Sequence, residues 1–176
     1  TSSPRRTAYI NYLRPDIKII EMRGNIETRI NKVLKDKIYS IMLAKAGINR
    51  LIKLKENIHF FTIPLSQILP SPGQGAIAII YKKENIFNKK LCKKIECKNT
   101  GVNLAAERSL IKEINGDCLT PIAALSRIRK NNIFLKAKLF SSEKNSFAIS
   151  QKSGPIKKSN LLGKQCANDL LRKLKN

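Results

Sequence analysis

The order of apolar and polar positions in the first third of the chain predicts helices that alternate with strands. Ser3 precedes a proline, a pair typical of a helix N-cap and first turn, and the helix that it begins extends to about Leu13. Residues 16–22 and 39–44 are rich in β-branched and apolar side chains, which favours strands. Between them, Asn25 can cap a helix. A strand, a helix and a buried strand in this order predict a βαβ unit, hence a parallel sheet with a right-handed crossover.

The middle of the chain is divided by glycines and prolines. Residues 47–55 fit a short helix, and residues 64–75 contain so many helix and strand breakers that we expect a crossing segment. Residues 76–81 fit a further strand. A lysine-rich stretch follows over residues 82–98, and beyond it the pattern changes.

The last part of the chain predicts a small α+β domain with a three-stranded antiparallel sheet. Its apolar spacing predicts a helix over residues 104–114 and a closing amphipathic helix over residues 161–174. Between these helices, alternating segments separated by polar turns predict strands over residues 122–128, 133–140 and 147–151.

The charge of the chain restricts its partners to anions. In 176 residues, 35 are basic and 12 acidic, which gives a net charge of +23. Codon bias in an AT-rich genome explains many of the lysines, because isoleucine is equally abundant, but it does not explain the arginines. Half of the ten arginines lie in the first 29 residues, and Arg5 and Arg6 fall in the first turn of a predicted helix. Cations oppose the helix dipole there, so we expect an anion beside them and the Ser2 and Ser3 hydroxyls.

Several kinds of site have little support. The four cysteines form no CxxC pair and His59 is the single histidine, so we expect no metal. No P-loop is present. No apolar run is long enough to span a membrane, and no secretion signal opens the chain, so we expect a cytoplasmic protein without a membrane partner.

Cys118 lies between a predicted helix end and a predicted strand start, so a loop exposes its thiol. A lone cysteine is more often a small buried hydrophobic residue. The adjacent Asp117 would raise the thiol pKa rather than lower it. Residue types and spacing alone leave both interpretations open.

Seven segments, in this order along the chain, resemble the porphobilinogen deaminase (hydroxymethylbilane synthase) family of tetrapyrrole biosynthesis. They are TSSPRR (1–6), RP (14–15), RGNIETR (23–29), AKAGINR (44–50), PGQGA (72–76), AER (106–108) and GDCLTP (116–121). The resemblance implies a periplasmic-binding-protein-like α/β domain followed by the small α+β domain. Residues 1–63 would form most of the second α/β domain, residues 64–98 the crossing segment with a remnant of the first domain, and residues 99–176 the C-terminal domain with Cys118.

The resemblance also implies a reaction and a cofactor. Family members condense four porphobilinogen units to hydroxymethylbilane, with loss of ammonia, on a dipyrromethane cofactor. Cys118 would hold this cofactor through a thioether. The acetate and propionate groups of the pyrrole rings require many fixed cations, and the residues that would bind them are Ser2, Ser3, Arg5, Arg6, Arg23, Arg29, Arg50 and Gln74.

The family's general acid is an aspartate of the first domain, and no residue of these 176 matches it. We therefore expect no catalytic residue within the chain and little activity from it alone. It would be a fragment, one piece of a split gene or a decaying copy, with a separate N-terminal chain as a partner if the gene is split. The resemblance favours a monomer for the intact enzyme, and the oligomeric state of this chain stays open.

Two other classes of function stay open on charge alone. The first is a nucleic-acid-binding module, which the 6% aromatic content and the absence of tryptophan disfavour, so we expect no nucleic-acid partner. The second is a non-catalytic carboxylate-binding domain that would use Arg5, Arg6 and Arg29 and leave Cys118 unmodified.

Overall fold

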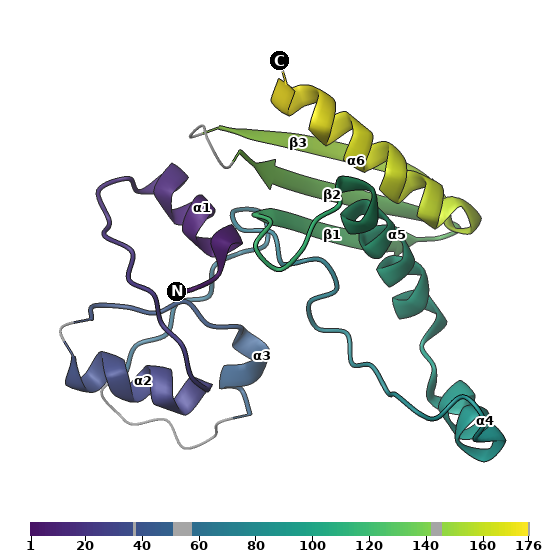
Figure 1. Ribbon diagram of the computed structural model, residues 1–176, viewed down its shortest axis with the longest axis horizontal. Coiled ribbons are helices and arrows are strands. Elements are labelled where there is room, and N and C mark those ends of the chain that lie inside the picture. Colours follow the sequence, from purple (N-terminus) through teal and green to yellow (C-terminus); the bar gives the residue numbers. More distant parts are fainter. Residues whose placement is uncertain (37, 51–57, 142–145, 176) are drawn as a thin grey trace. The chain divides into compact units, whose positions relative to one another are not determined.

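The computed structural model describes residues 1–36, 38–50, 58–141 and 146–175. These residues form two compact units. The first consists of residues 1–68, 119–121 and 140–146, and the second of residues 69–118, 122–139 and 147–176. Figure 1 labels the helices and strands. The expected three-part division at residues 63 and 98 stays a prediction.

The first unit contains three helices whose starts follow from local sequence. Helix α1 (Pro4–Leu13) begins after Ser3, whose side chain accepts a hydrogen bond from the Arg6 backbone N–H. Helix α2 (Ile26–Lys35) begins after Asn25, whose Oδ1 accepts from the Thr28 backbone N–H at 2.8 Å. Both predicted helices are therefore confirmed. Helix α3 is a single turn (Lys45–Ile48), and most of the helix expected over residues 47–55 lies outside the described residues.

The strands expected at residues 16–22, 39–44 and 76–81 are absent from the described structure, so the prediction of a βαβ unit there is wrong. A strand exists only with a neighbour that completes its hydrogen-bond ladder, and apolar composition does not supply one. Backbone groups of residues 16–22 instead meet Thr1 and Ser2. The Thr1 nitrogen donates to the Ile20 carbonyl at 2.9 Å, and the Ser2 hydroxyl both donates to and accepts from the Met22 backbone at 2.8 Å.

The second unit contains a sheet in the order β1-β2-β3, formed by β1 (Ile122–Arg129), β2 (Asn132–Phe140) and β3 (Phe147–Pro155). Strands β1 and β2 pair antiparallel with Ala124 opposite Ala137. The predicted three-stranded antiparallel sheet is confirmed. Strand β3 extends four residues beyond the predicted end, into the 3₁₀ turn Ile156–Lys158.

Two helices pack against this sheet and enclose the main core. Helices α5 (Lys98–Ile114) and α6 (Ser159–Lys175) lie side by side in Figure 1, and α5 contacts β1 while α6 contacts β3. The core consists of apolar side chains from both helices and all three strands, among them Leu110, Ile133, Leu135, Ala148 and Leu170. Burial of these side chains is the main source of stability for this unit.

Sequence periodicity missed helix α4 (Ile86–Ile95) and the first six residues of α5. Helix α4 starts after Asn85, whose Oδ1 accepts from the Asn88 backbone N–H at 2.9 Å. Phe87, Leu91 and Ile95 recur at helical spacing on α4, but no residue of this helix is buried, and the many lysines around them hid the pattern.

Candidate anion-binding and thiol sites

Three arginines of the first unit form a concentration of positive charge. Arg5 is buried. Its burial is the larger cause that lowers its pKa, and the positive charge of the neighbouring Arg6 is the second. Burial and the charge of Arg29 lower the pKa of Arg6. The positive charge of Arg6 is thus repelled by both Arg5 and Arg29. The mutual repulsion is relieved when an anion binds, so this arginine cluster (Arg5, Arg6, Arg29) fits carboxylate ligands.

Backbone carbonyl groups hold two of these side chains in place. Arg6 donates from Nη1 to the Met42 carbonyl at 2.7 Å, and Arg29 donates from Nε to the Gly24 carbonyl at 2.8 Å. Neither side chain has a carboxylate partner in the described part of the chain. Their remaining guanidinium N–H groups can therefore donate to a bound anion.

The two serines differ in what they can still donate. The Ser2 hydroxyl makes both bonds to the Met22 backbone, so its proton is already used. The Ser3 side chain accepts from the Arg6 N–H at 3.5 Å and keeps its proton for another acceptor. Ser3 is therefore the better placed of the two predicted hydrogen-bond donors.

The structure does not join Arg23 and Arg50 to the cluster through any contact between described residues. Both side chains are exposed, and neither makes a hydrogen bond or ion pair within the described ranges. Their assignment as cofactor-binding residues stays a prediction.

Gln74 lies in the second unit, in a turn over residues 71–75. Its backbone N–H donates to the Ser71 carbonyl at 3.0 Å, and its Oε1 accepts from the Ser71 N–H at 3.1 Å. Gly73 and Gly75 have φ angles of 74° and 91°, which favour glycine. The Gln74 amide NH₂ makes no hydrogen bond to a described residue, so it can donate to a ligand.

Cys118 also lies in the second unit, and its thiol is exposed, as its loop setting predicts. Helix α5 stops at Asn115, which is left-handed with a φ of 55°, and Gly116 donates from its N–H to the Ile111 carbonyl at 3.0 Å. This C-cap fixes the start of the turn that carries the thiol. The structure therefore places Gln74 and Cys118 in one unit and the arginine cluster in the other.

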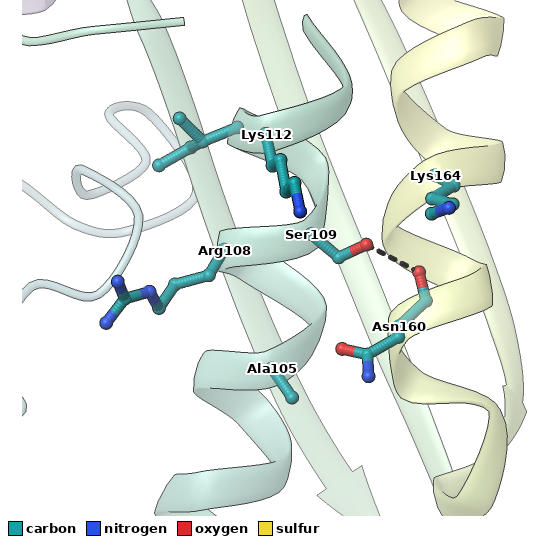
Figure 2. Close-up of a pocket in the computed structure, with 7 residues that line it drawn as sticks. Ala105, Arg108, Ser109, Lys112, Asn160 and Lys164 are labelled. Carbon is teal, nitrogen blue, oxygen red and sulfur yellow. Dashed lines mark hydrogen bonds between the residues drawn. The ribbon is translucent and has the colours of Figure 1, made fainter. Parts of the chain in front are cut away.

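A cavity of about 800 Å³ lies between α5 and α6 and coincides with no predicted site residue. Its lining includes Arg108, Lys112 and Lys164, and the Ser109 hydroxyl donates to the Asn160 carbonyl at 2.7 Å. Figure 2 shows Arg108 pointing away from α6, so the three cations do not converge on one point. The described residues hold no group of three or more potential metal ligands and no helix able to cross a membrane.

Sequence reasoning assigned no role to Glu107, which the structure places at 7% exposure on α5 with three hydrogen bonds. The available signal was its position beside Ala106 and Leu110 on the buried stripe of that helix. A carboxylate at such a position requires internal donors.

Two protein-family models match nearly the whole chain. Residues 1–90 match the family model described as "Porphobilinogen deaminase, dipyromethane cofactor binding domain", and residues 101–172 match "Porphobilinogen deaminase, C-terminal domain". The chain belongs to the porphobilinogen deaminase family. The resemblance stated from the seven sequence segments is thereby confirmed.

Curated relatives named porphobilinogen deaminase are longer than this chain. The relative from Clostridium novyi is 34% identical over 99% of this chain and 58% of its own length. The relative from Clostridium acetobutylicum is 42% identical over 73% of this chain and 43% of its own length, and that from Orientia tsutsugamushi is 35% identical over 99% and 58%. The chain thus spans somewhat more than half the length of the relatives that it matches from end to end.

Proposed function

We propose that this chain takes part in the condensation of porphobilinogen to hydroxymethylbilane, with a dipyrromethane cofactor bound to Cys118. What supports the proposal is that one chain carries both an exposed Cys118 thiol and, in its first unit, the side chains of Arg6 and Arg29, which have no carboxylate partner among the described residues. When bound, dipyrromethane supplies the primer to which pyrrole units are added.

The residues of the chain have distinct tasks in this proposal. Arg5, Arg6 and Arg29 neutralise pyrrole acetate and propionate groups, and Arg23 and Arg50 extend this contact along a growing polypyrrole. Ser3 and the Gln74 amide donate hydrogen bonds, each from its own unit, and Ser2 holds the Met22 backbone. Cys118 anchors the primer covalently, which requires exposure rather than a strongly acidic thiol.

Other parts of the proposal concern the whole protein. We propose that residues 16–22, 39–44 and 76–81 become strands of a periplasmic-binding-protein-like sheet in a longer chain or with a separate N-terminal chain. That partner would also supply the general acid. Their exposed apolar side chains support this proposal, since Tyr39 is 99% and Ile80 93% exposed. A cytoplasmic monomer stays the expectation for the intact enzyme.

The intact mass of the chain, purified from a host that makes porphobilinogen, tests the cofactor assignment. We expect an added dipyrromethane that maps to Cys118, gives the colour reaction of pyrroles with acidic aldehyde, and is lost in C118S. C97S is the matched control, because Cys97 is also exposed and hydrogen bonding from Thr100 lowers its pKa.

Two results would contradict the assignment. An addition that survives C118S or disappears in C97S would place the pyrrole on the wrong thiol. An unmodified Cys118 in a chain that binds carboxylates through the arginine cluster would favour the non-catalytic carboxylate-binding alternative.

A further inference from the structure

Glu107 is a buried carboxylate with every hydrogen bond directed to another part of the fold. Its Oε2 accepts from the Gly73 backbone N–H at 2.6 Å. Its Oε1 accepts from the Ser126 N–H at 2.8 Å and from the Ser126 hydroxyl at 2.7 Å. Three donors thus meet its two oxygens, and both oxygens act as acceptors.

These bonds connect three segments that are distant in sequence. Gly73 belongs to the turn over residues 71–75, Glu107 to α5 and Ser126 to the outer edge of β1. A second bond follows the same edge, since the Ala124 N–H donates to the Pro70 carbonyl at 3.0 Å. Residues 70–73 are thus held on the C-terminal domain by two hydrogen bonds, one to Ala124 and one to Glu107.

The chain just before the turn is held separately, by burial of Leu69 and by the bond to Pro70. The internal bonds of the turn join Ser71 and Gln74, and both residues are exposed. Gly73 lies close to Leu104, because a Cβ added to Gly73 would be 3.3 Å from the Leu104 Cδ2. Gly75 lies in open space, because a Cβ added there would meet nothing within 4 Å. Within the turn itself, the bond from Gly73 to Glu107 is the hydrogen bond that joins it to α5.

We propose that Glu107 is a positioning residue that acts through Gln74. By holding the Gly73 backbone, it presents the next side chain from a fixed point on the unit that carries Cys118. The role of Gln74 toward the cofactor rests on the function proposed above, whereas the anchoring of Gly73 does not.

Amide hydrogen exchange in the unmodified chain, measured by NMR, tests the anchor first. We expect the Gly73 amide to exchange at least about tenfold more slowly than the Gly75 amide, although both lie in the same turn. Equal rates for the two amides would overturn the proposal without any variant.

E107Q supplies the second measurement, with S126A as its matched control. The single oxygen of glutamine cannot accept from both Gly73 and Ser126, so one N–H faces an amide NH₂. We expect E107Q to speed exchange at Gly73 by about tenfold or more, and S126A by less than about threefold, because its backbone N–H and the Gly73 bond remain. If Gly73 exchange became equally fast in E107Q and S126A, the hydrogen bond from Gly73 to Glu107 would not be what holds the Gly73 backbone.

Cofactor loading then separates positioning from general support of the fold. If Glu107 acts through Gln74, E107Q and Q74A should lower the loaded fraction of Cys118 to a similar extent, and the double variant should lower it no further. Additive losses would mean that Glu107 acts independently of Gln74 and would overturn the proposal. Absence of loading in the unmodified chain would count against the proposed function, while the exchange rates would still decide the anchor.

Discussion

Among single residues, Asp169 is the carboxylate whose charge the fold stabilises most clearly. Its oxygens accept from Lys173 at 2.9 Å and from Arg172 at 3.1 Å, all on α6. The hydrogen bond from Lys173 is the largest cause that lowers its pKa from 3.8 to about 2. A carboxyl whose folded pKa is depressed stabilises the fold above its unfolded pKa, and this contribution is lost as the pH falls through the folded value.

We therefore predict that D169N lowers the free energy of unfolding at pH 7 by about 1 kcal/mol or less, because the cations that it pairs with are partly exposed. The difference from the unmodified chain should shrink between pH 3.8 and about 2. Urea unfolding across this range measures it. D16N is the control, because Asp16 pairs with Arg14 on the open surface, where ion pairs contribute little. A difference that persists below pH 2 would contradict an electrostatic cause.

In our proposal, the positive charge of Arg6 binds a carboxylate of the dipyrromethane cofactor. We predict that R6Q weakens capture of dipyrromethane by about tenfold or more, because a carboxylate loses a charge-assisted hydrogen bond. R6K should restore part of the affinity, and R127Q, an exposed arginine of β1, should change nothing. The loaded fraction in intact mass spectra measures the effect. Equal losses in R6Q and R127Q would show that only net charge matters.

At the scale of elements, the contact between α5 and α6 depends on a glycine. A Cβ on Gly163 of α6 would overlap the Ala106 carbonyl oxygen and lie 2.8 Å from the Ser109 Cβ. Because backbone cannot move aside as a flexible side chain can, the helices would have to separate.

We predict that G163A lowers the free energy of unfolding by about 1–3 kcal/mol. Gly101 of α5 offers a matched substitution, because a Cβ there meets nothing within 4 Å. G101A should stabilise the chain by about 0.5–1 kcal/mol through helix propensity. Thermal or urea unfolding of both variants checks the pair, and destabilisation by both would refute the packing explanation.

Elements that depend on nearby residues could be predicted from sequence, whereas those that depend on distant partners could not. Caps at Ser3 and Asn25 located α1 and α2, and alternation with polar turns located β1 and β2. The strand expected at residues 16–22 failed because nothing among the described residues pairs with its backbone as a strand. Glu107 was missed for a related reason, since its donors lie 34 and 19 residues away.

At the scale of the whole molecule, the family of the chain and the share of its relatives' length that it spans have separate consequences for cofactor binding and for turnover. Family models cover residues 1–90 and 101–172, yet the chain spans 58% of the Clostridium novyi relative. The motif resemblance assigns cofactor-binding residues within the 176 residues and assigns the general acid outside them. Binding of the cofactor and turnover can therefore be tested apart.

We predict that the 176-residue chain alone shows no measurable turnover of porphobilinogen, because a developing positive charge on pyrrole needs a carboxylate that the resemblance does not place here. The assay follows porphobilinogen consumption with a chain whose Cys118 loading is known from its mass. A full-length relative is the positive control. Turnover by the loaded chain alone would refute the argument from the missing acid.

The bonds that Pro70 and Glu107 accept from β1 have a further effect on the sheet. An edge strand normally leaves a row of N–H and C=O groups that another molecule can copy as a new strand. On β1, the Ala124 and Ser126 N–H groups already donate to Pro70 and Glu107. A neighbouring polypeptide in a crowded solution therefore finds fewer free groups at this edge, which disfavours association of the sheets through it.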